Sequence, residues 1–247
     1  MILELDAGNT RIKWRLVGGD QIVTGGAFAA DKPGNAVQAL VEELDRQQTG
    51  ALERIRVSSV RGADFNTAFG ALARETWNME AEFAKVSARA AGVTNAYEDI
   101  GAMGVDRWMA LLAAYNRAEG GCCVIDYGSA ITFDWVNSSG VHQGGYIVPG
   151  VNLMQQSLAS KTRALDIHLP EPFRLEPGKS TGEAIGNGMF TMVCGFATLC
   201  HQQVARAGDD ARWFLTGGDA VMLGEVLPWE HEVVSDLVLD GLCYALP

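Results

Sequence analysis

One short motif occurs in both halves of this chain, and this duplication limits the folds that are open to it. The motif reads Asp-Ala-Gly-Asn-Thr at residues 6–10 and Asp-Tyr-Gly-Ser-Ala at residues 126–130. Each copy ends an apolar run that is typical of a buried strand, and each is followed by two further β-like runs with glycine-containing turns. We therefore expect two similar lobes that arose by internal duplication.

The spacing of the apolar residues predicts alternating strands and helices in both halves. In the first half we expect strands at 2–5, 11–17, 22–28, 54–60 and 81–86, and helices at 35–48, 64–77 and from about 104. In the second half we expect strands at 122–126, 130–136, 141–148 and 213–216, and helices at 150–160, 181–207 and near the C-terminus. The sequence therefore predicts an α/β fold with lobes at residues 1–118 and 119–247.

The charge and hydropathy of the chain exclude several classes of protein. The net charge of −11, without a cluster of lysine or arginine, argues against nucleic-acid binding. The longest mostly apolar stretch, residues 188–200, is too short to span a bilayer, and the N-terminus lacks the features of a secretion signal. We therefore expect a cytoplasmic protein that does not bind membranes.

The cysteines and histidines indicate neither disulfides nor a transition-metal site. The five cysteines have no metal or redox spacing, so all are predicted to be reduced thiols in apolar surroundings. The four histidines are scattered without a second ligand at a suitable spacing.

The paired Asp-x-Gly turns are candidate phosphate sites. Each places a carboxylate at the end of a strand, where glycine lets backbone N–H groups approach an anion closely. One such turn alone is more often an ordinary hairpin turn, but two at equivalent places favour a binding role. Asn9, Thr10 and Lys13 add donors and a positive charge that suit a triphosphate.

Two other phosphate motifs are excluded. Gly-Lys-Ser at residues 178–180 resembles the end of a P-loop, but Phe173 stands where that loop has its first glycine. The glycines at 182, 186 and 188 do not form a dinucleotide-binding fingerprint after a strand. Ser180 and Glu183 instead predict a capping box at the start of a helix.

Four motifs in series resemble the signatures of the type III pantothenate kinases in order and spacing. They are Asp-x-Gly-Asn-Thr-x-x-Lys at 6–13, Gly-Val-Asp-Arg at 104–107, Asp-x-Gly-Ser-Ala-x-Thr at 126–132 and Thr-Gly-Gly-Asp at 216–219. Residues 144–150 and 181–188 agree as well, so the resemblance covers essentially the whole chain. It implies an actin-like, ribonuclease H-like duplicated fold with ATP in the cleft between two lobes. It also implies ATP-dependent phosphorylation of pantothenate to 4'-phosphopantothenate, the first step of coenzyme A biosynthesis.

The resemblance also implies the residues of the site. The ATP-binding residues would be Asp6, Ala7, Gly8, Asn9, Thr10, Arg11, Ile12, Lys13, Ser129, Gly217 and Gly218. The pantothenate-binding residues would be Tyr97, Gly104, Val105, Asp106, Arg107 and Thr181. Asp126 would hold a monovalent cation, K⁺ or NH₄⁺, while Asp6 would act on Mg²⁺ through water. The active form would be a homodimer whose pantothenate pocket is completed near the subunit interface.

Two residues of the Gly-Val-Asp-Arg motif are open to a catalytic or a structural interpretation. Asp106 is the candidate acceptor of the proton of the pantothenate hydroxyl, or else a carboxylate that complements a helix dipole. The dipole would keep it a weak base, which the loose transition state of phosphoryl transfer tolerates. Arg107 would orient a substrate oxygen or spread charge, or else form an ordinary surface ion pair.

Two positions depart from the family pattern, and two other functions remain open. Ser129 stands where the family usually has threonine, so the loss of a methyl group could loosen the loop, and Tyr127 replaces a more usual aliphatic residue. A non-catalytic accessory factor of the same family and an actin-like kinase for a sugar or a carboxylate are the alternatives. The presence of Asp6, Lys13, Asp106 and Asp126 together favours catalysis.

Overall fold

The structure is a computed structural model that describes residues 1–19, 21–29, 52–161 and 174–247, together with positions 38, 41, 42, 44 and 46. These residues form two compact units, Met1–Arg117 with Asp236–Pro247 and Ala118–Ser235. The segment Asp236–Pro247 thus groups with the first unit, although the sequence placed all of residues 119–247 in one lobe. The helix expected at 35–48 lies almost entirely outside the described residues.

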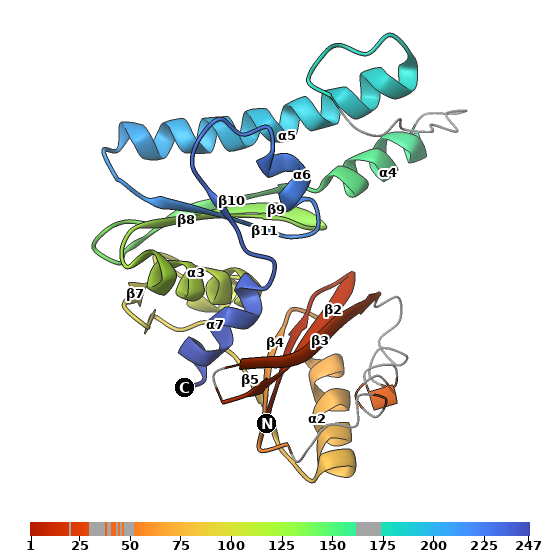
Figure 1. The fold of residues 1–247 in the computed structure, drawn as a ribbon, viewed down its shortest axis with the longest axis vertical. Helices are drawn as coiled ribbons and strands as arrows, with labels where there is room; N and C mark the ends of the chain where they lie inside the picture. Colours follow the sequence, from red (N-terminus) through yellow and green to blue (C-terminus); the bar gives the residue numbers. More distant parts are fainter. Residues whose placement is uncertain are drawn as a thin grey trace. The chain divides into compact units, whose positions relative to one another are not determined.

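The first unit contains a five-stranded sheet in the order β3-β2-β1-β4-β5 (Figure 1). Its strands are β1 (Ile2–Ala7), β2 (Arg11–Gly18), β3 (Gln21–Ala29), β4 (Arg54–Ser59) and β5 (Ala81–Phe83). The strands β1, β2 and β3 form antiparallel pairs, because short turns join them, whereas β1, β4 and β5 are parallel. The parallel pair β4 and β5 needs a crossover, which α2 (Ala63–Trp77) supplies.

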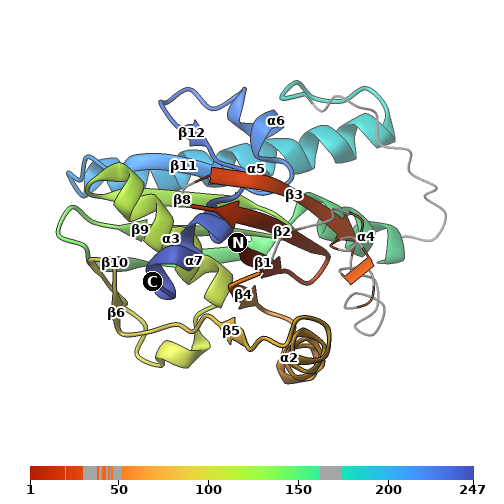
Figure 2. The ribbon, with the colours of Figure 1, turned by 60° about the horizontal axis from the view of Figure 1, so that its bottom comes forward.

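Helices cover both faces of this sheet. Side chains alternate between the faces of a strand, so Leu3 and Leu5 pack with Phe65 and Phe69 of α2, while Glu4 points the other way. The remaining elements of the unit are β6 (Arg89–Ala90), β7 (Val93–Thr94), η1 (Ile100–Ala102), α3 (Val105–Ala118) and α7 (Leu237–Ala245). The last of these helices lies against β1 and β4 (Figure 2).

The C-terminal helix α7 packs on the first unit through a close approach and ion pairs. A Cβ atom at Gly241 would collide with the backbone of Met109, so only glycine allows α7 to lie this close to α3. Asp240 accepts a hydrogen bond of 2.6 Å from Arg15, whose guanidinium also donates to the buried Glu4 at 2.7 Å. These contacts explain why the end of the chain belongs to the first unit.

The second unit repeats the strand order and directions of the first. Its sheet has the order β10-β9-β8-β11-β12, in which β8 pairs antiparallel with β9 and parallel with β11 (Figure 1). The strands are β8 (Cys122–Tyr127), β9 (Ala130–Val136), β10 (His142–Pro149), β11 (Arg212–Thr216) and β12 (Glu232–Val233). The helices are α4 (Val151–Lys161), α5 (Thr181–Arg206) and α6 (Ala220–Gly224). The predicted duplication is therefore confirmed.

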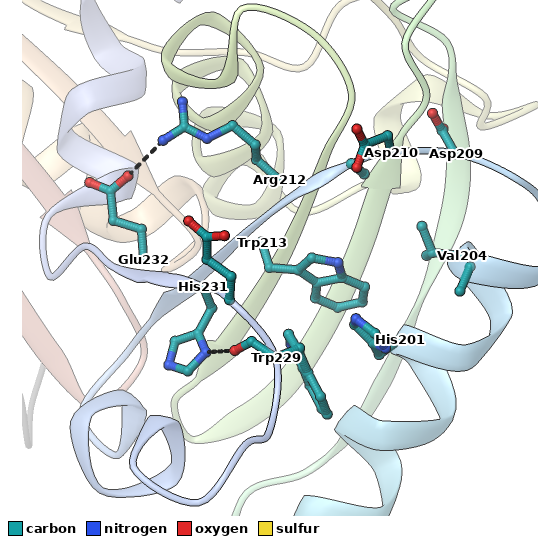
Figure 3. A pocket seen from close by; sticks show the side chains of 12 residues that line it. His201, Val204, Asp209, Asp210, Arg212, Trp213, Trp229, His231 and Glu232 are labelled. Carbon is teal, nitrogen blue, oxygen red and sulfur yellow. Dashed lines mark hydrogen bonds and ion pairs between the residues drawn. The ribbon is translucent and has the colours of Figure 1, made fainter.

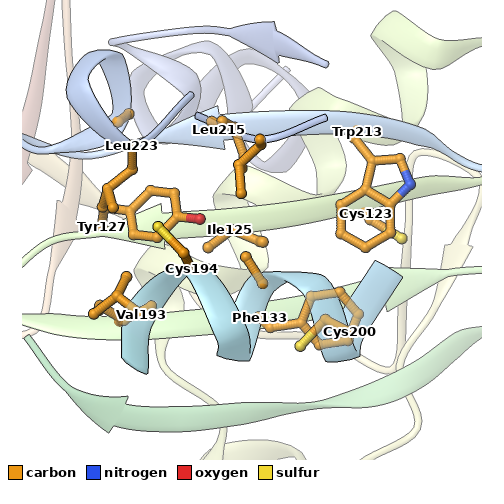
Figure 4. Packing of buried hydrophobic residues seen from close by; sticks show 14 of the residues in the cluster. Cys123, Ile125, Tyr127, Phe133, Val193, Cys194, Cys200, Trp213, Leu215 and Leu223 are labelled. Atoms are coloured by element: carbon orange, nitrogen blue, oxygen red, sulfur yellow. The ribbon is translucent and has the colours of Figure 1, made fainter. Parts of the chain in front are cut away.

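The long helix α5 covers one face of the second sheet. Ile125 and Tyr127 of β8 pack against Val193 and Cys194 of α5 in a continuous apolar layer (Figure 4). The helix begins at the predicted capping box, because Ser180 accepts from the Glu183 N–H at 3.2 Å and Glu183 accepts from the Ser180 N–H.

The cysteines are free thiols, as the sequence predicted, but not all of them are in the core. Cys122, Cys123, Cys194 and Cys200 are buried. Burial raises the pKa of Cys194 to about 11 and that of Cys200 to about 12, so both stay protonated at neutral pH. Cys243 is exposed, contrary to the expectation, because it lies on the outer side of the terminal helix. Among the described residues, no helix is long and apolar enough to cross a membrane.

Candidate active site

The two Asp-x-Gly motifs occupy the same place in the two sheets. Asp6 is the fifth residue of β1, and its cross-strand neighbours are Lys13 in β2 and Ser58 in β4. Asp126 is the fifth residue of β8, and its neighbours are Thr132 in β9 and Thr216 in β11. Each aspartate therefore has a polar neighbour on both sides, which concentrates polar groups at the same end of each sheet.

The turn after β1 leaves its polar side chains accessible. Asn9, Thr10 and Arg11 are exposed, whereas the side chains of Ala7 and Ile12 are completely buried in the core. The two buried residues can therefore contribute only backbone groups to a ligand.

Lys13 is held near this turn by the segment that precedes α7. Its Nζ atom lies 3.9 Å from Oδ1 of Asp236, and both side chains are partly exposed. An ion pair of this kind is weak, so Lys13 can exchange it for a phosphate at little cost. Asp236 could not be predicted from the sequence, because its position depends on how the C-terminal helix packs.

The turn after β8 is fixed by the end of β10. The Gly150 N–H donates to the Ser129 carbonyl at 3.1 Å, and a Cβ atom at Gly150 would collide with the carbonyl of Gly128. Ser129 is exposed. Its backbone is thus fixed by a close backbone contact.

The carboxylate of Asp126 lies beside a glycine that the local geometry requires. Gly217 has a φ of +94°, and a Cβ atom there would lie 2.5 Å from both Asp126 Oδ1 and the carbonyl oxygen of Tyr127. A carboxylate and a carbonyl oxygen thus approach one backbone position in the second unit. Oxygen donors of these two kinds bind hard cations and K⁺, so the residues present fit a monovalent cation.

The first unit also offers a ligand that is compatible with Mg²⁺. Magnesium is commonly bound by one or two carboxylates together with substrate phosphates and water, and Asp6 supplies a carboxylate at the end of β1. Among the described residues there is no group of three or more histidine, cysteine or acidic side chains that could hold a metal by itself.

The Gly-Val-Asp-Arg motif forms the start of α3 and packs with Tyr97. Arg107 is only 7% exposed, and its Nη1 donates to the Tyr97 hydroxyl at 2.8 Å. Its guanidinium also lies 5.7 Å from the centre of the tyrosine ring. The alternative that Arg107 is an ordinary surface residue is therefore wrong.

Asp106 lies in the first turn of α3, as the sequence predicted. Its Oδ1 accepts from the Arg107 N–H at 2.8 Å, and a Cβ atom at Gly104 would come within 2.6 Å of the same oxygen. Glycine at position 104 therefore leaves the space that this carboxylate occupies. Asn95, which the sequence analysis did not single out, accepts from the Tyr97 N–H at 2.9 Å and fixes that residue.

The predicted site residues are divided between the two units. The first unit brings together Tyr97 and residues 104–107, and it carries the turn at 6–13. The second unit carries the remaining predicted residues, which are Asp126, Ser129, Thr181, Gly217 and Gly218. Thr181 is exposed at the first position of α5.

Asp219, the last residue of the Thr-Gly-Gly-Asp motif, is in an unfavourable environment. It is the N-cap residue of α6, yet its side chain makes no capping hydrogen bond. Desolvation raises its pKa above the ordinary value for aspartate. Groups with shifted pKa values are common at functional sites, which agrees with the place of Asp219 in a predicted binding motif.

The duplicated sheets and their paired Asp-x-Gly turns define a ribonuclease H-like fold of the actin-like ATPase class. A solved structure assigned as a 2-dehydro-3-deoxygalactonokinase from Sinorhizobium meliloti matches with a TM-score of 0.61. The match covers 98% of this chain and 97% of that chain at 14% sequence identity, so it shows the fold alone.

Sequence comparison shows the family within this class. The family model described as type III pantothenate kinase matches residues 2–203. The type III pantothenate kinase of Pseudomonas putida (strain F1) is 40% identical over 253 residues, which cover 100% of this chain and 99% of that protein. That of Pseudomonas aeruginosa is 40% identical over 256 residues, with the same coverage. This chain belongs to the type III pantothenate kinase family, and it is an ATP-using kinase.

Proposed function

We propose that this kinase transfers the γ-phosphoryl group of ATP to the primary hydroxyl of pantothenate, which gives 4'-phosphopantothenate for coenzyme A biosynthesis. The observation that carries this proposal is 40% identity to named type III pantothenate kinases over the full length of both proteins. We place this reaction in the cytoplasm, where ATP is abundant.

In the first unit, we assign the turn at residues 6–13 to the phosphates of ATP. The exposed donors of Asn9 and Thr10 would bind phosphate oxygens. Lys13 would break its ion pair with Asp236 and neutralise the phosphate charge instead. Asp6 would hold Mg²⁺ through water, and this ion supplies positive charge to the transferred phosphoryl group. Positioning and charge neutralisation are the main contributions to catalysis in such transfers.

In the second unit, we assign Ser129 to phosphate, and Gly217 and Gly218 to the nucleotide. Asp126 would hold a monovalent cation, because its carboxylate and the Tyr127 carbonyl lie together beside Gly217. Such an ion would add positive potential for an anionic substrate.

At the start of α3, we assign Asp106 as the acceptor of the hydroxyl proton. Gly104 leaves room for its carboxylate, and the helix N-terminus keeps the carboxylate charged. Arg107 would bind the anionic or carbonyl oxygens of pantothenate, since Tyr97 holds its guanidinium in place. Thr181 would contribute a hydroxyl to the same substrate.

We also infer that two copies associate through α5. Gly188, Met192, Gly195 and Leu199 are exposed at a 4-3-4 spacing that forms one stripe along the helix. No charged residue occurs in α5 between Glu183 and Arg206. In a chain with a net charge of −11, an uncharged face of this kind is where a second copy can approach without repulsion.

Measurement of ADP release with different acceptors tests the substrate assignment. Purified protein with ATP and Mg²⁺ should release ADP when pantothenate is present, and only slowly with sugars or with no acceptor. Equal release without pantothenate would contradict the proposal, and activity on a sugar alone would favour another kinase of this fold. Absence of any ADP release would favour the non-catalytic accessory role.

A further inference from the structure

The second unit contains a cavity that none of the proposed ATP or pantothenate residues lines. The end of α5, the start of β11 and the segment before β12 line an open cavity of about 640 Å³, which is a normal size for a small-molecule site (Figure 3). Arg212 and Trp213, the first two residues of β11, line the cavity, whereas the Thr-Gly-Gly-Asp motif begins at the last residue of that strand. Thr216 lies three positions beyond Trp213, roughly 10 Å along β11.

Three aromatic rings form one wall of this cavity. The rings of His201 and Trp229 stack at 4.4 Å with an angle of 22°, and those of Trp213 and Trp229 meet edge to face at 5.9 Å. Desolvation lowers the pKa of His201, so its ring is uncharged at neutral pH. Neutral aromatic faces grouped in this way attract organic cations.

The polar lining of the cavity is mainly acidic. Four carboxylates line it, those of Asp209, Asp210, Glu230 and Glu232, against the single guanidinium of Arg212. Arg212 donates to Glu232 at 3.3 Å, and Asp209 accepts from the indole N–H of Trp135 at 3.0 Å. Within the described residues, Asp210 and Glu230 have neither an ion pair nor a hydrogen bond. Two carboxylates are therefore available to balance the charge of a bound cation.

Trp213 adds a donor that the protein itself does not satisfy. This residue is only 7% exposed and lines the cavity, yet its indole N–H donates to no acceptor in the part of the chain that the structure describes. This N–H is not enclosed by protein atoms, so it can donate to a ligand that carries an oxygen acceptor.

We propose that this cavity is a second ligand site, which binds a small organic ammonium ion with a hydroxyl group. The aromatic faces and the carboxylates would bind the ammonium group, and the Trp213 N–H would donate to the hydroxyl oxygen. ATP and pantothenate are both anions, so neither suits an acidic cavity. The site is thus distinct from the kinase substrate sites.

Choline and 3,3-dimethylbutan-1-ol provide a direct test, because they have the same shape and hydroxyl but only choline is charged. Binding to the full chain would be followed by ligand-detected NMR and by calorimetry at constant ionic strength, with NaCl replacing the choline salt. We expect saturable binding of choline that is at least about tenfold tighter than that of the neutral alcohol. Absence of saturable choline binding, or equal binding of the two compounds, would overturn the proposal.

Substitutions locate the site. Trp229→Leu should abolish choline binding. The double substitution Asp210→Asn with Glu230→Gln should weaken choline binding about tenfold, and the protein should stay folded because both positions are exposed. Glu225→Gln removes a similar exposed charge outside the cavity and should change nothing. Choline binding that is the same in the double variant and in the Glu225→Gln control would show that the cavity is not the site. None of these readouts depends on kinase activity.

Discussion

The burial of Arg107 decides between two interpretations that the sequence alone leaves equally open. An arginine in the first turn of a helix is commonly a surface residue, and the sequence does not show its burial. In the structure its guanidinium is almost completely enclosed and bonded to the Tyr97 hydroxyl. A buried cation that is held in place in this way is suited to binding a substrate oxygen.

Replacement of Asp106 tests its assignment as the proton acceptor. Asp106→Asn keeps the size of the side chain but removes its basicity, so kcat should fall by about 10²- to 10⁴-fold. The loss of one charge at a helix start should cost only about 0.3–1 kcal/mol of stability.

Asp64 provides the matched control for that substitution. It is the acidic residue in the first turn of α2, in the same unit and outside every predicted motif. Asp64→Asn should have a similar small effect on stability and none on kcat. Near-normal turnover of the Asp106→Asn variant would refute the assignment.

Asp219 gives a prediction about the pH dependence of stability. Its pKa is raised in the folded state, so the ionised form destabilises the fold at pH 7 and this penalty disappears as the pH falls through the raised pKa. Asp219→Asn should therefore raise Tm at pH 7, by no more than about 2–4 °C for a chain of this size. The difference from the wild type should shrink as the pH is lowered from 7 to 4. A variant that is less stable than the wild type at pH 7 would show that favourable interactions in the folded state offset the desolvation of this carboxylate.

The elements themselves were largely predictable, because most have a clear period and clear ends. The helix expected at 181–207 is Thr181–Arg206, since the Ser180 capping box defines its start and its apolar face repeats regularly. The strand expected at 81–86 is only Ala81–Phe83. The short hairpin of β6 and β7 was missed because two-residue strands have no period to detect.

The prediction about the monovalent cation concerns residues near the ends of β8 and β11. If Asp126 binds K⁺, turnover should rise with K⁺ or NH₄⁺, and Asp126→Ala should remove this activation. Gly217→Ala should do the same by a different route, because its methyl group would collide with the Asp126 and Tyr127 oxygens. Na⁺ salts at equal ionic strength are the control for general screening. An Asp126→Ala variant with full K⁺ activation would contradict the cation site.

In the whole molecule, the duplication could be predicted from the sequence, whereas the position of the chain's end could not. The two Asp-x-Gly turns are visible in the sequence, and they lie at the same register in the two sheets. The association of α7 with the first unit depends on Gly241, Asp240 and Asp236, whose partners are distant in the sequence. Contacts of this kind leave no local pattern.

The proposed α5 interface predicts how the oligomeric state responds to charge. Leu199→Glu places a carboxylate on the exposed stripe, and two such carboxylates would repel each other across a symmetric interface. Light scattering should then give a mass near 26.5 kDa for the variant, against twice that mass for the wild type. Ile22→Glu in β3, which is similarly exposed, should remain dimeric. A dimeric Leu199→Glu variant would place the interface elsewhere. A monomeric wild type would exclude the dimer.

Identification of the reaction product tests the proposed activity most directly. Wild-type protein would be incubated with ATP, Mg²⁺, K⁺ and pantothenate, and the products examined by mass spectrometry and ³¹P NMR. We predict one new phosphomonoester on the primary hydroxyl of pantothenate, formed in equal amount to ADP and greatly reduced with Asp106→Asn but not with Asp64→Asn. Formation of ADP without a phosphorylated pantothenate, or a phosphate on the secondary hydroxyl, would contradict the proposed function.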